Sequence, residues 1–308
     1  MLCRHCFVPV CLYLPSSRQP TLVQFTHYPG LALHYIPNKP LAAVAGILYL
    51  SVPALCIYWG FKRWARYMLT IMIGGVCYAA GLFIRIPFGA NQDTLGLYII
   101  MNMLTVLSPC AFIATVYMLL GRLAIHLDAD EYLLIKSRLI TKIFVTSNIV
   151  TLMIQASGGS MAASTTNGNL GSKIFLVGLI VQLISFCLYM VVFAVFLRRM
   201  KLHRPEECVL PRNSAEFFTH WTALAGSIVV SCVGILIRSI FRTIENAQGF
   251  TGYLATHEVY FYVLDTLPLL IAIVVFVITW PPMYLTQYGR AGSKDTAVEM
   301  AMSPSSRK

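Results

Sequence analysis

Residues 238–268 read RSIFRTIENAQGFTGYLATHEVYFYVLDTLP, and this stretch joins two long apolar segments at 217–237 and 259–280. It places two arginines, two glutamates and one aspartate where the flanking composition predicts a lipid environment. Ionisable side chains at membrane depth cost roughly 2.5–3.5 kcal/mol each on insertion unless they are paired or hydrated. A chain that keeps five of them between two membrane helices is therefore expected to use them.

The spacing of these residues predicts that they share helical faces. Arg238, Arg242 and Glu245 stand at i, i+4 and i+7, so they lie on one face if the first helix continues that far. The second segment repeats this spacing with Glu258, Tyr262 and Asp265. An interfacial interpretation stays open for the arginines and Glu258, whose long side chains would reach water, whereas the side chain of Asp265 is too short to reach as far.

The composition predicts an integral membrane protein. The 308 residues are 57% hydrophobic and only 11% charged, whereas soluble proteins carry about 25% charged residues. The net charge of +11 comes from basic residues in short loops between apolar runs. This pattern is typical of membrane topology rather than of a continuous nucleic-acid-binding face, so we predict no nucleic-acid partner.

Seven apolar runs are each close to the ~20 residues that cross a bilayer core. They occupy 41–61, 67–84, 95–120, 143–158, 174–197, 217–237 and 259–280. Only helices or closed barrels satisfy backbone groups in lipid, and runs of this length and composition indicate helices. The predicted fold is all-α and polytopic, with seven transmembrane helices in one bundle. The polar residues in the fourth run make it the weakest, and six spans would remain without it.

Basic residues are divided unequally between the two sides of the predicted bundle. The side of the membrane on which the C-terminus lies holds sixteen Lys and Arg residues, and the side on which the N-terminus lies holds seven. The excess of positive charge in cytosolic loops predicts an outside N-terminus and a cytosolic C-terminus. We therefore expect an extracellular or lumenal segment at 1–39, a membrane domain at 40–285 and a disordered cytosolic tail at 286–308.

This orientation places polar residues of four spans near the outer end of the bundle. Arg85 closes the second span, Asn148 and Gln155 share one face of the fourth, and the arginine pair closes the sixth. Convergence of these groups with the acidic residues of the seventh span would form a polar pocket. The candidate substrate-binding or ion-coupling residues are Arg85, Asn148, Gln155, Arg238, Arg242, Glu245, Glu258, Tyr262 and Asp265.

The sequence favours neither a metal site nor an enzyme. Three cysteines and a histidine lie close together near the N-terminus, at Cys3, His5, Cys6 and Cys11. One CxxC without a second pair is weak evidence for zinc. A metal-dependent lipid hydrolase would need histidine and acidic ligands at one depth, whereas His220 and His257 are predicted at opposite faces of the membrane. We expect no cofactor, no metal and no catalytic residue.

Three motifs together give the chain a resemblance to a known family. The stretch 238–268 resembles R-x-x-[FY]-R-x-x-E-x-x-x-G-x-x-G followed by E-x-x-x-Y-x-x-D-x-x-P. FVTSNIVTLMIQASGGSM, at 144–161, is similar to F-x-x-x-D-x-x-[ST]-x-x-x-Q-x-x-G-G. LSPCAFIATVYMLLGRL, at 107–123, looks like a third-span motif that ends in Tyr117, Gly121 and Arg122. Over about 33–285 the chain resembles the fungal lipid-translocating exporters, seven-span proteins linked to aminocholesterol resistance and sphingoid long-chain-base export.

The resemblance implies a fungal protein of the plasma membrane or an internal membrane that handles amphipathic lipids, and the chain departs from the family pattern at two places. Asn148 stands where the family has an acidic residue in the fourth span. Tyr78 and Leu82 replace the acid and the tyrosine of E-x-x-G-Y-x-x-R, although Gly81 and Arg85 remain. If those acids bind a substrate amine or carry protons, the departures would change selectivity or coupling.

Lipid export, with membrane lipids and an amphipathic cationic lipid as partners, is the function that we predict. A sphingoid base or amino-sterol has a cationic head, and Glu245, Glu258 and Asp265 in a partly dehydrated pocket would suit its ammonium group. The sequence has no Walker A motif, so transport would run downhill or be coupled to protons through Asp265 or Glu258.

Two alternatives assign the same features differently. The ionisable residues of opposite sign are also compatible with a static network that holds two helices together. Seven spans with an outside N-terminus and a serine-containing tail are also the layout of a receptor or lipid-sensing regulator. Against a receptor, the predicted intracellular loops are short, and no acidic residue directly precedes Arg122.

Overall fold

The computed structural model describes residues 38–60, 68–88, 95–162, 168–205, 220–249 and 253–281. All of them fall within one compact unit, Ala32–Lys308. The predictions for the N-terminal segment, including its cysteines and His5, and for the tail at 286–308 lie outside the described residues.

Seven helices in the described part of the chain are long and apolar enough to cross a membrane, and the same residues contain no strand. Six are single α-helices: α1 (Lys39–Gly60), α2 (Leu69–Phe88), α3 (Leu95–His126), α4 (Ser137–Ala162), α5 (Gly168–His203) and α7 (Trp221–Gln248). The seventh is composed of α9 (Glu258–Tyr260), the π-helix η4 (Phe261–Thr266) and α10 (Leu267–Thr279). Two short pieces, η2 (Asp130–Tyr132) and α8 (Tyr253–Thr256), lie in connections. The predicted all-α, seven-span fold is confirmed, including the weak fourth run, which lies within α4.

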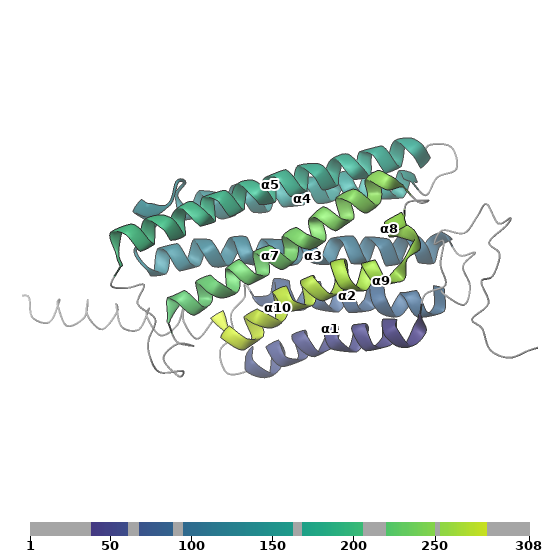
Figure 1. The fold of residues 1–308 in the computed structure, drawn as a ribbon, viewed down its shortest axis with the longest axis horizontal. Helices are drawn as coiled ribbons and strands as arrows, with labels where there is room; N and C mark the ends of the chain where they lie inside the picture. The colour runs from purple at the N-terminus through teal and green to yellow at the C-terminus, as the bar shows by residue number, and fades with distance from the viewer. Residues whose placement is uncertain are drawn as a thin grey trace, which may run out of the picture. The chain divides into compact units, whose positions relative to one another are not determined.

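Successive long helices run in alternating directions (Figure 1). The most extensive helix pairs are α4 with α5, α2 with α3, α1 with α2, and α7 with α10. Because the number of spans is odd, α1 begins at the end of the bundle opposite to the end of α10. The protein is a multi-pass membrane protein, and its orientation across that membrane stays a prediction.

Helix α7 continues well beyond the apolar run that predicts it. The run ends at 237, whereas α7 ends at Gln248, where Gly249 adopts a φ of 73°. Glycine adopts a positive φ at little cost, so it can end the helix at this point. Ser239 and Thr243 each donate a hydroxyl hydrogen bond to the carbonyl four residues earlier. Polar residues therefore extend α7 without interrupting it.

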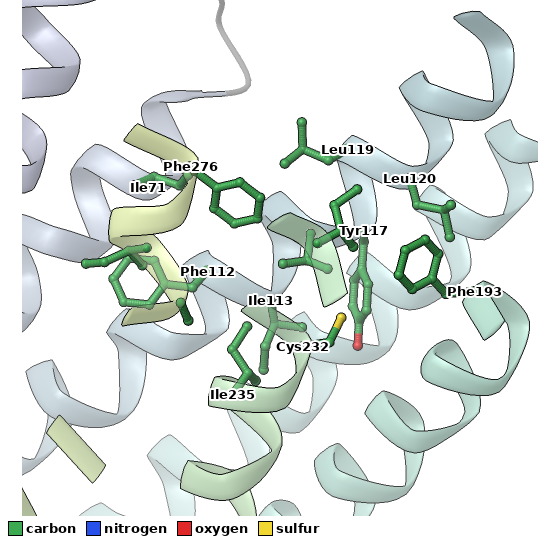
Figure 2. Close-up of a cluster of buried hydrophobic side chains, with 14 of the residues drawn as sticks. Ile71, Phe112, Ile113, Tyr117, Leu119, Leu120, Phe193, Cys232, Ile235 and Phe276 are labelled. Atoms are coloured by element: carbon green, nitrogen blue, oxygen red, sulfur yellow. The ribbon is translucent and has the colours of Figure 1, made fainter. Parts of the chain in front are cut away.

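Apolar side chains from α2, α3, α5, α7 and α10 meet in the core of the bundle, as Figure 2 shows. Tyr117 lies at the centre of an aromatic group and packs against Phe144 and Tyr189, with ring centroids 5.3 and 4.5 Å away. The Tyr189 hydroxyl donates to the carbonyl of Val116 over 3.0 Å. Outward-facing α4 and α5 expose many large apolar side chains, as expected for surfaces that contact lipid.

Gly234 brings α7 into backbone contact with α10. A Cβ atom at this position would overlap the carbonyl oxygen of Pro268 and lie 3.1 Å from the Cβ of Ala272. Small residues at such crossings let membrane helices approach closely. This contact lies next to the charged residues of both helices, so it helps to set the distance between them.

We predict that Gly234→Ala destabilises the protein by about 1–3 kcal/mol, the usual cost of overpacking. The added methyl group meets backbone rather than a flexible side chain, so α7 and α10 must separate. Gly226→Ala is the matched control on the same helix, because a Cβ there would meet no atom within 4 Å. Thermal unfolding of both purified variants in detergent measures the difference, and equal melting temperatures would contradict the prediction.

Candidate functional site

Asp265 is the centre of a buried ionic cluster. Its side chain is fully buried, and Arg238 Nε forms an ion pair with Asp265 Oδ1 over 2.5 Å. Arg242 Nη2 donates to Asp265 Oδ2 over 2.6 Å. The Tyr78 hydroxyl of α2 donates to the same oxygen over 3.2 Å. One carboxylate thus connects α7, η4 and α2.

The π-helical turn of η4 determines where Asp265 points. Pro268 has no N–H to continue the regular hydrogen-bond pattern, and the N–H of Leu267 instead donates to the carbonyl of Tyr262, five residues earlier. A π-turn contains more residues than an α-turn, and such turns are frequent at functional sites. The Tyr49 hydroxyl of α1 donates to the carbonyl of Thr266 over 2.7 Å, which holds the end of η4 in place.

A proline in α3 creates the second anchor of Arg238. Pro109 lacks the N–H that would otherwise bond to the carbonyl of Thr105 one helical turn earlier. Arg238 Nη2 donates to this carbonyl over 2.8 Å. The missing backbone bond of one helix is therefore replaced by a charged donor from another, and α3 becomes attached to the ionic cluster.

Arg242 extends the cluster towards the end of the bundle at which α1 begins. Its Nη1 donates to Glu245 over 3.1 Å. The Phe261 ring contacts two cations, with its centroid 4.0 Å from Arg85 Cζ and 5.3 Å from Arg242 Cζ. Arginine over an aromatic face is a favourable contact. Arg85 is also 5.9 Å from the centre of the Tyr262 ring.

A second polar cluster consists of amides and joins α3, α4 and α5. Asn148 Nδ2 donates to the carbonyl of Cys110 over 2.8 Å. Gln182 Nε2 donates to Asn148 Oδ1 over 3.2 Å, and Gln155 Nε2 donates to Gln182 Oε1 over 2.6 Å. The backbone carbonyl at one end sets the direction of this amide chain, because a carbonyl can only accept. At the other end, Gln155 Oε1 is buried without a hydrogen-bond partner among the described residues.

A pocket separates the ionic cluster from the amide chain. Helices α3, α4, α5 and α7 form its walls, and its polar lining residues are Gln155, Gln182, Arg238, Ser239, Arg242 and Asn246. Six apolar residues complete the lining: Val106, Pro109, Ile113, Phe175, Leu179 and Leu183. The cavity measures about 20 Å³, which has room for water or a small polar group but not for a whole lipid.

The structure divides the nine sequence-predicted residues into several groups. Four form the ionic cluster: Arg238, Arg242, Glu245 and Asp265. Asn148 and Gln155 belong to the amide chain, and Arg85 lies beside Phe261 and Tyr262. Glu258 instead accepts from the backbone N–H of Asn38, with both oxygens 3.0 Å from the nitrogen. Glu258 and Asp265 have different surroundings because the π-turn of η4 begins between them.

Sequence reasoning missed three participants. Gln182 is an isolated amide in a very apolar span, and its polarity at that depth was an available signal. Tyr78 was singled out only as a departure from the pattern that the resemblance implies, and it hydrogen-bonds to Asp265. Thr105 contributes through its backbone carbonyl, which no side-chain pattern could indicate. No group of three or more His, Cys, Asp and Glu residues suited to a metal occurs in the part of the chain that the structure describes.

We predict that Asp265→Asn lowers the free energy of unfolding by roughly 3–5 kcal/mol, because it leaves a buried arginine uncompensated. Adding Arg238→Gln should recover part of this loss, since the Arg242–Glu245 pair then remains balanced. Glu258→Gln is the control and should cost about 1 kcal/mol or less, because the amide oxygen can still accept from Asn38. Unfolding of the purified proteins in detergent tests the order, and equal losses for the two single variants would contradict it.

Comparison with known proteins confirms the resemblance that the three motifs indicate. The family model described as RTA1 like protein matches residues 71–288. No solved structure matches the chain significantly.

Several relatives come from Saccharomyces cerevisiae. Protein RTA1 is 30% identical over 236 residues, which cover 77% of this chain and 72% of the relative. Protoporphyrin uptake protein 1 is 30% identical over 208 residues, which cover 68% of this chain and 66% of that protein. Sphingoid long-chain base transporter RSB1 is 26% identical over 292 residues, with coverages of 82% and 73%. The chain therefore belongs to the RTA1-like family of membrane proteins.

Proposed function

We propose that the protein moves amphipathic lipids across the membrane, sphingoid long-chain bases and amino-sterols among them, and thereby contributes to resistance to toxic lipids or drugs. Its relatives support transport as the activity, because one is named a sphingoid long-chain base transporter and another a protoporphyrin uptake protein. The observation that carries the proposal is a pocket with polar and apolar walls inside a seven-helix membrane bundle.

The pocket has the two kinds of wall that an amphiphile requires. Gln155, Gln182 and Arg238 supply hydrogen-bonding groups, whereas Phe175 and Leu179 of α5 belong to the apolar lining. Ligand sites commonly combine a mainly apolar lining with a few polar groups that orient the ligand. A polar head and the beginning of an acyl or sterol body would each find a compatible surface.

Transport requires this pocket to widen, because its present volume of about 20 Å³ excludes a lipid head with its chain. Two groups of helices, each held together by polar contacts, contribute to the walls of the pocket. The amide chain joins α3, α4 and α5, and the ionic cluster joins α7 to η4 and α2. Relative movement of two such groups around a central site is the usual principle of alternating access. Helices α2 and α3 pack extensively and keep the two groups joined there. Opening on the pocket side would break or lengthen the contact between Arg238 and the carbonyl of Thr105.

The energy source follows from what the sequence contains. It has no Walker A motif, so we propose movement down the substrate gradient or coupled to protons. Direct coupling through Asp265 would require this carboxylate to release two arginines. Glu258 has no such arginine contact among its described hydrogen bonds and ion pairs and is the more accessible proton-linked candidate.

The proposal is tested by reconstitution into liposomes with a fluorescent sphingoid long-chain base. The wild type should accelerate its movement between leaflets over protein-free vesicles. Ser239→Leu should reduce the rate at least several-fold, because the larger side chain fills the pocket that Ser239 lines. An unchanged rate in this variant, or no activity of the wild type towards long-chain bases or amino-sterols, would contradict the proposal.

Thr243→Leu is the matched control for this experiment. Thr243 lies one turn further along α7, and like Ser239 its described hydroxyl bond goes to the carbonyl four residues earlier. Thr243 does not line the pocket. The Thr243→Leu variant should therefore transport at nearly the wild-type rate. A wild-type melting temperature for Ser239→Leu would show that its slower transport comes from a blocked pocket and not from a damaged fold.

A further inference from the structure

The charge that the pocket presents is positive rather than negative. Two guanidinium groups, Arg238 and Arg242, belong to its lining, and no carboxylate belongs to the lining that the structure describes. Asp265 is fully buried and pairs with both arginines, Glu245 pairs with Arg242, and neither carboxylate belongs to the lining. A ligand in the pocket therefore meets the cationic side of each ion pair, which argues against direct recognition of an ammonium group by these carboxylates.

Polar atoms without partners lie on both sides of the pocket. Arg242 Nε is buried and has no hydrogen-bond partner among the described residues. Gln155, whose side chain is fully buried, leaves its Oε1 unpartnered at the end of the amide chain. Buried polar groups without partners are costly and call for an explanation. Neither atom has surface open to the cavity in this structure, so a bound group that accepts from the guanidinium side and donates to the amide oxygen would reach them only once the pocket widens.

We propose that this pocket binds the oxyanion head of an amphiphile, a carboxylate or a phosphate ester. Arginine suits these groups because its planar guanidinium has donors in fixed directions and carries a permanent charge. Hydrogen bonds of this kind are stronger than those between neutral groups. The monoanion of a phosphate monoester also brings an O–H donor for Gln155 Oε1 while it keeps a negative charge for the arginines.

The apolar lining indicates that the oxyanion belongs to an amphiphile rather than to a free ion. Leu179, Leu183 and Phe175 of α5 and Ile113 and Val106 of α3 belong to the same lining as the arginines. A free inorganic anion would gain nothing from these side chains, whereas an alkyl body removes them from water or lipid on binding. The inference goes beyond the proposed function by ranking the ligands of this pocket: amphiphiles with an oxyanion head bind here more tightly than long-chain bases and amino-sterols, whose cationic heads meet two arginines. It rests on the proposed function only for the movement of the ligand.

Competition binding with chain-matched probes tests the head group directly. Purified wild-type protein in detergent binds tritiated dodecanoate, and unlabelled dodecyl phosphate, dodecanol, dodecylamine and inorganic phosphate are the competitors. Dodecyl phosphate should compete about ten-fold better than dodecanol, because one charge-assisted hydrogen bond corresponds to a factor of about ten in affinity. Dodecylamine and inorganic phosphate should compete least.

Each other outcome overturns a defined part of the inference. Stronger competition by dodecylamine would overturn the oxyanion assignment. Equal competition by dodecanol would remove any role for charge, and equal competition by inorganic phosphate would overturn the assignment to an amphiphile.

Ser239 offers a pair of variants that locates the binding in this pocket. Ser239→Asp places a carboxylate beside the two arginines, where it competes with the ligand, and should weaken dodecanoate binding about ten-fold or more. Ser239→Asn has nearly the same size without the charge and should stay within a few-fold of the wild type. Equal affinities of the two variants would place the binding elsewhere. If Ser239→Asp does not fold, the wild-type competition series still decides the head group.

Binding and transport fail independently in this design. A protein that binds dodecanoate with the expected preference but moves no amphiphile in liposomes would contradict the proposed function and leave the pocket assignment intact. A protein that moves long-chain bases but prefers dodecylamine would contradict the oxyanion assignment and leave transport intact.

Discussion

The attraction between one buried aspartate and two arginines determines the arrangement of the helices around it. Asp265 is held by Arg238 and Arg242 of α7 and by Tyr78 of α2, and Arg238 also reaches the carbonyl of Thr105 in α3. If either partner of such a pair is removed, the other is left as an unpaired charge in an environment that does not hydrate it. Because the arginines line the neighbouring pocket and the carboxylate does not, the same constraint decides which charge that pocket presents.

Periodicity and composition predicted the features that depend on local chemistry. The apolar runs indicated seven helices, and the i, i+4, i+7 spacing placed Arg238, Arg242 and Glu245 together because α7 continues to Gln248. The spacing of Glu258 and Asp265 was less informative, because η4 inserts a π-turn between them. Contacts through backbone atoms, such as the carbonyl freed by Pro109, depend on which helices are neighbours. A single sequence contains too little information to determine those neighbours.

The two departures from the family pattern have a common physical effect. Tyr78 and Asn148 stand where acids are expected, and each here is a neutral donor within one of the two polar clusters. An ionised acid in place of Tyr78 would lie close to Asp265, where two negative charges repel each other. With neutral donors at both positions, the buried charges of the ionic cluster balance without further carboxylates.

The balance of charge in the ionic cluster also has an electrical consequence. Arg238 and Arg242 carry two positive charges, and Glu245 and Asp265 carry two negative ones. Carrying one elementary charge across 100 mV involves about 2.3 kcal/mol of work. A set of residues with no net charge that moves as a unit involves none. Rearrangement of these four residues as a unit along the bilayer normal is therefore insensitive to the membrane potential, and any voltage dependence must come from other charges, such as the buried Arg85, or from what the protein carries.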